Sequence, residues 1–203
     1  MCIRDSCSIC GQTPIKKSTN HYFFKLKNFS EPLIDYLSNA PYLQKDVKKY
    51  VENWIKEGLV DWDITRDISW GVPIPIEGLD NKVFYGWFDN HLAYISSSIK
   101  FLNDKGIDGK SFWNDADIYH FIGKDIVYHH YLFLPAMRLG INKEFKLPDY
   151  IPTRGHLTLE SKKISKSRNW YIGLKEFLEI FPADYLRSVS YTHLRAHETS
   201  LHL

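Results

Sequence analysis

The stretch DIYHFIGKD, residues 117–125, decides the fold that we expect for this chain. Its first seven residues form a short, largely apolar run, which predicts a strand that ends at Gly123. Asp125 then opens a helix that we expect to continue to about Leu139, because an acidic residue directly after a turn is a common helix start. A strand followed by a helix is the unit from which α/β folds are built.

The same unit occurs before this stretch and begins again after it. Residues 82–88 predict a buried strand, and a helix follows from about Leu92 to Leu102. Residues 150–159 predict a further strand. Strand, helix, strand, helix, strand is typical of a doubly wound parallel sheet. We therefore predict an α/β fold in which ligands bind beyond the carboxyl ends of the strands.

The first 60 residues show a different pattern, with mainly helical spacing of apolar residues. Residues 22–26 predict a short strand, and residues 31–37 and 44–56 carry apolar side chains at helical spacing. Gly58 stands where the second helix should end, as a C-cap.

Cys7 and Cys10 form a CxxC pair, the shape of one zinc knuckle. A structural zinc ion needs four ligands, and a second such pair is absent, so a redox pair or unbound thiols explain the motif comparably well.

The composition is that of an ordinary soluble globular protein, with 44% hydrophobic and 25% charged residues and a net charge of +2. Three cysteines and no apolar run of about 18 residues indicate a protein of the reducing cytoplasm without a membrane span.

Residues suited to chemistry gather where the expected strands end. Trp87 and Asp89 follow the first strand, Gly123 and Asp125 follow the second, and a lysine-rich loop follows the third. Because the carboxyl ends of parallel strands meet at one edge of a sheet, we expect these residues to form one site.

Each candidate side chain also has a purely structural explanation. Asp125 can cap its helix, or its carboxylate can accept both hydroxyls of a ribose. His130 can simply satisfy a buried hydrogen bond. Trp87 and Tyr94 can be core aromatics, or they can form the walls of a pocket for a linear apolar side chain.

The lysine-rich loop reads KKISKSR at residues 162–168 and carries four cations among small hydroxyl side chains. An ammonium group on a long stem can follow a phosphate whose geometry changes during a reaction. The simpler explanation is a solvated basic loop, or a patch that binds nucleic acid without chemistry. Arg66 presents a similar choice, since it can pair with Asp67 or bind a phosphate.

Residues 163–167 resemble the KMSKS signature of class I aminoacyl-tRNA synthetases, with Ile164 in place of the methionine. Three longer motifs precede this one: WDITRD at 62–67, FYGWFD at 84–89 and YHFIGKDIV at 119–127. Their order and spacing resemble those of the methionyl-tRNA synthetases over nearly all of residues 7–187.

The resemblance implies a Rossmann-type parallel-sheet catalytic domain that is interrupted by a zinc-bearing connective peptide. Residues 7–60 would belong to the connective peptide, 61–156 to the second half of the catalytic domain, and 157–188 to the region of the KMSKS loop. Residues 1–6 and 189–203 resemble translated sequencing-adapter read-through, and we expect both to be artefacts.

The resemblance also implies roles in the ATP-dependent activation of methionine. Asp125 would bind the ribose of ATP, and Gly123 would let the backbone approach the nucleotide. Lys163 and Lys166 would stabilise the pyrophosphate, and Arg66 would assist on the phosphate side. The implied methionine pocket consists of Trp87, Tyr94, Ile126 and His130.

The implied reaction uses ATP with Mg²⁺ and transfers methionine to tRNA(Met) for translation in the cytoplasm. Cys7 and Cys10 would supply two ligands of a structural zinc ion. The chain has Asn-His-Leu-Ala at 90–93 where the family commonly has Ala-Pro-Ile-Gly beside the amino-acid pocket. The HIGH motif and the first half of the nucleotide fold are absent, so we expect the chain alone to be inactive.

Two alternatives remain open. The first is another class I synthetase, for instance a leucyl or cysteinyl enzyme. The second is a degenerate module that binds tRNA without catalysis.

Overall fold

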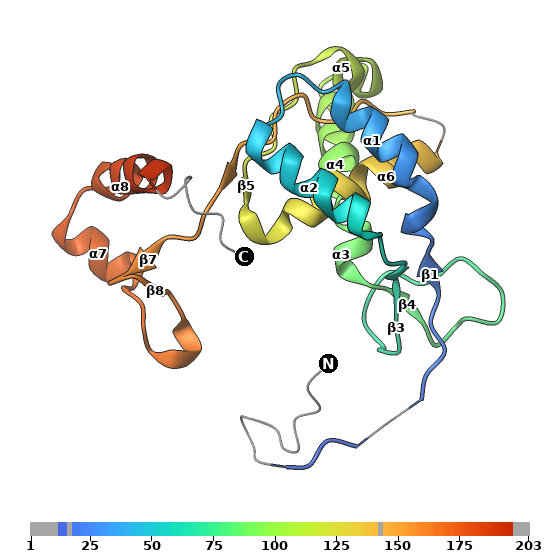
Figure 1. The fold of residues 1–203 in the computed structure, drawn as a ribbon, viewed down its shortest axis with the longest axis horizontal. Coiled ribbons are helices and arrows are strands. Elements are labelled where there is room, and N and C mark those ends of the chain that lie inside the picture. The colour runs from blue at the N-terminus through green and yellow to red at the C-terminus, as the bar shows by residue number, and fades with distance from the viewer. Residues whose placement is uncertain (1–11, 16–17, 142–143, 197–203) are drawn as a thin grey trace.

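The computed structural model describes residues 12–15, 18–141 and 144–196 (Figure 1). Cys7 and Cys10 lie outside the described residues, so their expected role as zinc ligands stays a prediction. Among the helices that are described, none has the length and apolar character needed to cross a membrane.

The two helices expected near the N-terminus are present. Helix α1 spans Ser30–Ser38 and helix α2 spans Lys45–Glu57, and the two pack against each other. Of the apolar positions of α2 that the spacing indicated, Val47, Val51 and Ile55 are buried, and Trp54 is half-buried against the core. Gly58 ends α2 with a φ of 104°, a backbone conformation that favours glycine, which confirms the predicted C-cap.

The main core joins these helices to the α/β part of the chain. Leu33 and Leu37 of α1 belong to the same buried cluster as Tyr131, Leu132 and Ile151. All five side chains are at most 1% exposed. Tyr131 also donates a hydrogen bond from Oη to the carbonyl of Ile151 at 3.2 Å. The N-terminal helices and the segment that follows Asp125 therefore share one core.

A parallel strand pair borders this core and contributes Ile122 to it. Strand β5 (Ile122–Gly123) pairs with β6 (Thr153–Arg154), so that Ile122 faces Thr153 and Gly123 faces Arg154. A parallel bridge between Tyr119 and Tyr150 extends the pairing backwards. The predicted α/β fold with parallel strands is confirmed for these two segments.

The prediction of a strand over residues 82–88 is wrong beyond residue 84. Strand β4 (Val83–Phe84) pairs antiparallel with β3 (Thr65–Arg66), outside the parallel pair. Helix α3 (Gly86–Asp89) begins directly afterwards and carries Trp87. The turn into α3 brings the ring of Phe88 back to within 5.5 Å of the ring of Phe84 in β4. A second antiparallel pair joins β1 (Phe23–Phe24) to β2 (Trp62–Asp63).

Helix α4 (Leu92–Asn103) agrees with the expected helix, whereas helix α5 (Gly109–Asp115) was not anticipated. Asp108 caps α5, since its carboxylate accepts hydrogen bonds from two backbone N–H groups of the first turn. A Cβ atom at Gly109 would lie 2.6 Å from the carbonyl oxygen of Ile99. Glycine at this position therefore permits the close approach of α5 to α4.

Helical structure covers the range expected from Asp125 to about Leu139, but it is not a single α-helix. A 3-10 turn, η2 (Lys124–Ile126), leads into a π-helical segment, η3 (His129–Phe133), and then into α6 (Leu134–Gly140). π-helical turns inside helices are frequent at functional sites. This one carries His129 and His130.

The chain ends in a hairpin and two helices that lie apart from the main core in Figure 1 (orange to red). Strands β7 (Thr158–Leu159) and β8 (Lys162–Lys163) form the antiparallel hairpin. A 3-10 turn, η4 (Lys166–Arg168), follows β8. Helices α7 (Leu174–Ile180) and α8 (Ala183–Ala196) complete the described chain. Helix α8 continues into the segment expected to be adapter-derived, whose origin stays a prediction.

Candidate functional site

A cluster of aromatic and imidazole rings lies between α3, α4 and η3. Trp87 stacks on His129 with a centroid distance of 5.1 Å, and His91 stacks on His129 at 5.3 Å. Tyr94 contacts His120 at 4.6 Å and His130 at 5.8 Å. Three of the expected pocket residues, Trp87, Tyr94 and His130, are therefore brought together by ring contacts.

His130 has a defined tautomer. It is 2% exposed, and its Nδ1 lies 3.0 Å from the carbonyl oxygen of Ile126, which can only accept a hydrogen bond. Nδ1 therefore carries the proton, and Nε2 accepts a hydrogen bond from the hydroxyl of Tyr94 at 3.4 Å. Burial lowers the pKa of His130, so the ring is neutral at pH 7.

The other histidines of the cluster are neutral for the same reason. Burial and the neighbouring His130 lower the pKa of His91, His120 and His129 to about 4 each. Nδ1 of His120 and Nδ1 of His129 are buried, and neither atom has a hydrogen-bond partner among the described residues. The cluster is therefore uncharged, but it holds polar atoms that a ligand could satisfy.

Trp87 and Tyr94 are not core residues. They are 44% and 42% exposed, which leaves one side of the ring cluster open. Ile126 behaves differently, because its side chain packs against the main core while its carbonyl fixes His130. The exposure of the two aromatic rings agrees with pocket walls better than with a structural role.

Asp125 does not cap a helix through its side chain. Residue Gly123 is the N-cap of η2, and no side-chain cap bond is present there. The Asp125 carboxylate instead accepts a hydrogen bond at Oδ2 from Nε2 of His156 at 2.6 Å. The ammonium group of Lys163 lies 3.8 Å from the same oxygen. The structure therefore brings the lysine loop to the end of the parallel strand pair.

Gly123 lies at the end of β5 and is exposed. A Cβ atom at this position would meet no other atom within 4 Å. Protein packing therefore does not require a glycine here, and the backbone is open to an approaching molecule.

Arg66 pairs with a different carboxylate from the one considered in the sequence. Its Nη1 lies 2.9 Å from Oδ2 of Asp63, and its guanidinium lies 3.6 Å above the ring of Tyr85. Asp67 forms an ion pair with Lys82 instead. The carboxylate paired with Arg66 is therefore that of Asp63, while the β3–β4 pairing brings Lys82 beside Asp67.

The lysine loop has an ordered frame. Glu160 and Ser161 connect β7 to β8 with φ angles of 49° and 62°, and Ser165 forms an antiparallel bridge with Trp170. The indole N–H of Trp170 donates a hydrogen bond to the carbonyl of Leu159 at 3.1 Å. The side chains of Lys163 and Lys166 remain exposed on this frame.

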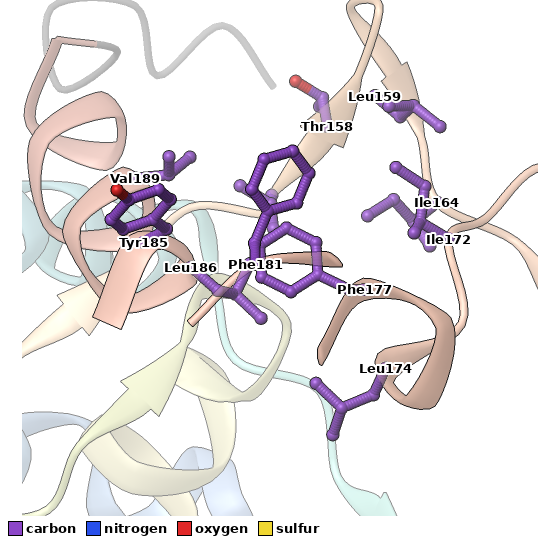
Figure 2. A pocket seen from close by; sticks show the side chains of 11 residues that line it. Thr158, Leu159, Ile164, Ile172, Leu174, Phe177, Phe181, Tyr185, Leu186 and Val189 are labelled. Carbon is purple, nitrogen blue, oxygen red and sulfur yellow. The ribbon is translucent and has the colours of Figure 1, made fainter. Parts of the chain in front are cut away.

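Ile164 has a clear reason to be apolar in so basic a loop. It lies with Ile172 and Phe177 in the lining of an apolar cavity of about 460 Å³ (Figure 2). The cavity is formed by the β7–β8 hairpin together with α7 and α8. Ile164 thus faces the apolar side chains of the C-terminal helices, while the side chains of its neighbours Lys163 and Lys166 stay exposed.

Sequence reasoning missed several residues of this site. His91 and His129 were not assigned a role, although they line the ring cluster. His156 and Trp170 also carried no motif signal. The one sequence clue to His156 is its position within the strand expected over residues 150–159, and this clue could be used only once the register of that strand was known.

Comparisons with known proteins identify the family to which this chain belongs. The family model described as tRNA synthetases class I (M) matches residues 2–201. The methionine–tRNA ligase of Methanopyrus kandleri is 46% identical over 183 residues, which is 89% of this chain and 27% of the relative. That of Pyrococcus furiosus is 39% identical over 201 residues, which is 91% of this chain and 28% of the relative.

A solved structure of Mycobacterium tuberculosis methionyl-tRNA synthetase bound by methionyl-adenylate is also similar. It has a TM-score of 0.72 and 26% sequence identity, over 91% of this chain and 35% of the other. The chain thus spans about a quarter of the length of the curated relatives that it matches. The extent of the family match shows that this chain belongs to the methionyl-tRNA synthetase family of class I tRNA synthetases.

Proposed function

We propose that this chain supplies the methionine pocket and the KMSKS loop of a methionine–tRNA ligase. Such an enzyme activates methionine with ATP to methionyl adenylate and transfers it to tRNA. The observation that carries the proposal is the contact of Lys163 with Asp125, which joins the loop to the expected nucleotide site. The methionine–tRNA ligases among its relatives support the choice of amino acid.

The ring cluster suits an uncharged amino-acid side chain. Trp87, Tyr94, Ile126 and His130 would enclose the thioether of methionine. The low pKa values of the neighbouring histidines leave these rings uncharged at pH 7, so they add no charge to the pocket, which favours an apolar ligand. The unpaired nitrogens of His120 and His129 offer partners for the polar groups of the ligand.

The charged residues suit the nucleotide. The carboxylate of Asp125 would accept the ribose hydroxyls, beside the open backbone of Gly123. When the methionine carboxylate attacks the α-phosphate of ATP, the bond to the leaving pyrophosphate breaks and negative charge grows there. Lys163 and Lys166 would stabilise that charge, with Arg66 on the phosphate side and Mg²⁺ as the accompanying cation.

The remaining features follow from the same proposal. Residues 7–60 would be the connective peptide, with Cys7 and Cys10 as zinc ligands, and residues 61–156 the second half of the Rossmann-type domain. Residues 157–188 would then be the KMSKS region, as expected above. tRNA(Met) would be the macromolecular partner, and the cytoplasm the compartment.

A grafting experiment tests the proposal. Residues 7–187 replace the aligned segment of the Methanopyrus kandleri ligase, and methionine-dependent ATP–pyrophosphate exchange is measured, with leucine and cysteine as competing substrates. We expect exchange with methionine alone, and a loss of at least about a hundredfold in Lys163→Ala, because a charged partner of the leaving group is removed. Lys162→Ala is the matched control, since Lys162 lies over the ring of Trp170 and has no assigned role.

The outcomes separate the alternatives. Exchange with leucine or cysteine in place of methionine would indicate a different class I synthetase. A folded graft that retains tRNA binding but shows no exchange would favour the degenerate tRNA-binding module. The chain of 203 residues alone is expected to show no exchange.

A further inference from the structure

His156 and Asp125 lie next to each other, although they are 31 residues apart in the sequence. In the parallel pair, Gly123 of β5 faces Arg154 of β6. Asp125 follows Gly123 by two residues, in η2, and His156 follows Arg154 by two residues, so both lie just beyond the same end of the strand pair. The bond of 2.6 Å between His156 Nε2 and Asp125 Oδ2 is the result.

His156 is the more firmly held of the two partners. Its side chain is 28% exposed, whereas that of Asp125 is 63% exposed. The strand before it is anchored on α2, because the backbone N–H of Thr153 donates a hydrogen bond to Oε1 of Gln44 at 2.6 Å. An exposed carboxylate can take several rotamers, and a bond to a fixed imidazole selects one of them.

The second contact of Asp125 is of a weaker kind. Lys163 lies at 3.8 Å from Oδ2, and its side chain is 69% exposed. Ion pairs between exposed groups at this distance contribute little free energy, so Lys163 can leave when a phosphate offers a better partner. Both His156 and Lys163 contact Oδ2, and a carboxylate has enough lone pairs on its two oxygens to accept further hydrogen bonds.

We propose that His156 is a positioning residue of the nucleotide site. It holds the carboxylate of Asp125 ready for the two ribose hydroxyls, while Lys163 exchanges from that carboxylate to the phosphates of ATP. The inference rests on the proposed function, because it takes Asp125 as the ribose ligand.

The first measurement concerns the ligand-free chain of 203 residues. Imidazole nitrogen NMR should show His156 protonated at Nε2, with a proton that exchanges slowly because it is hydrogen-bonded. Asp125→Asn should make that proton exchange faster. If the spectra show His156 unprotonated at Nε2, the inference is overturned.

The second measurement compares adenosine with 2′,3′-dideoxyadenosine, which lacks both ribose hydroxyls. We expect the natural chain to bind adenosine about a hundredfold more tightly, the effect of two lost hydrogen bonds to a charged group. His156→Phe should remove that preference by weakening adenosine alone, and His156→Gln, which keeps an N–H donor, should restore part of it. His21→Phe is the matched control, since His21 lies 3.7 Å from the carboxylate of Asp63 and should leave both affinities unchanged.

The two proposals fail in different ways. If His156→Phe weakens both ligands equally, or keeps the preference for adenosine, His156 has no role in positioning and only the further inference is overturned. If the natural chain itself shows no preference for adenosine, Asp125 is not a ribose ligand. In that case the nucleotide assignment in the proposed function falls as well, and this inference with it.

Discussion

The buried His91 makes the stability of this fold depend on pH in a predictable direction. Its side chain is 2% exposed, and burial, together with His130 and His129, lowers its pKa to about 4. In the unfolded chain the pKa of a histidine is about 6.5. Between these two values the unfolded state binds a proton that the folded state does not. Stability is therefore fully present above pH 6.5 and is lost progressively as the pH falls toward 4.

The size of the effect follows from the two pKa values. Lowering the pH from 7 to 5 should reduce the free energy of unfolding by about 2 kcal/mol through His91 alone. His91→Phe removes this titration, so its free energy of unfolding should fall by about 2 kcal/mol less over the same range. Whatever the substitution does to stability at pH 7 cancels in this difference.

Urea unfolding at pH 7 and pH 5 measures the difference for each variant. Tyr94→Phe is the matched control, because it changes the same ring cluster without removing an imidazole, and it should keep the pH dependence of the natural chain. If His91→Phe and the natural chain lose the same free energy between the two pH values, His91 is not the titrating group and the reasoning is refuted.

Three smaller changes test other parts of the structure. Ser161→Gly should raise the free energy of unfolding by about 1 kcal/mol, because Ser161 has a φ of 62°, which glycine adopts without strain; a thermal scan would show it. Tyr131→Phe should cost about 1 kcal/mol, because the buried hydroxyl donates to Ile151, and urea unfolding would measure the loss. Trp170→Phe keeps an aromatic ring but removes the N–H that donates to Leu159, so trypsin should cut the lysine loop several times faster, and equal cutting rates would contradict this role.

The sequence was informative wherever a local pattern matched the final packing. Helices α1, α2 and α4 follow from apolar spacing, and Gly58 ends α2 as expected. The parallel pairing of β5 with β6 followed from the order of the elements. The spacing of apolar residues and the residues that end a helix are local properties of the chain, which is why a single sequence could indicate them.

Predictions from the sequence differed from the structure where contacts between distant segments outweigh the local pattern. Residues 84–88 look like a strand, but Phe88 packs on Trp62 and Phe84, and a helical turn achieves this. Likewise, the ion pair of Arg66 depends on which carboxylate the β3–β4 hairpin brings near it, and spacing in the sequence does not decide between Asp63 and Asp67.

His156 shows why part of a site stays hidden from sequence reasoning even when its motifs are found. Asp125 stands inside a long motif, but the residue that holds its carboxylate belongs to a connection between β6 and β7 and has no pattern of its own. Its role depends on the strand register, because a shift of β6 by one residue would place Gly155 or Leu157 opposite Asp125. Neither residue can donate a side-chain hydrogen bond. The proposed nucleotide site therefore depends on a backbone alignment as much as on the residues that the motifs name.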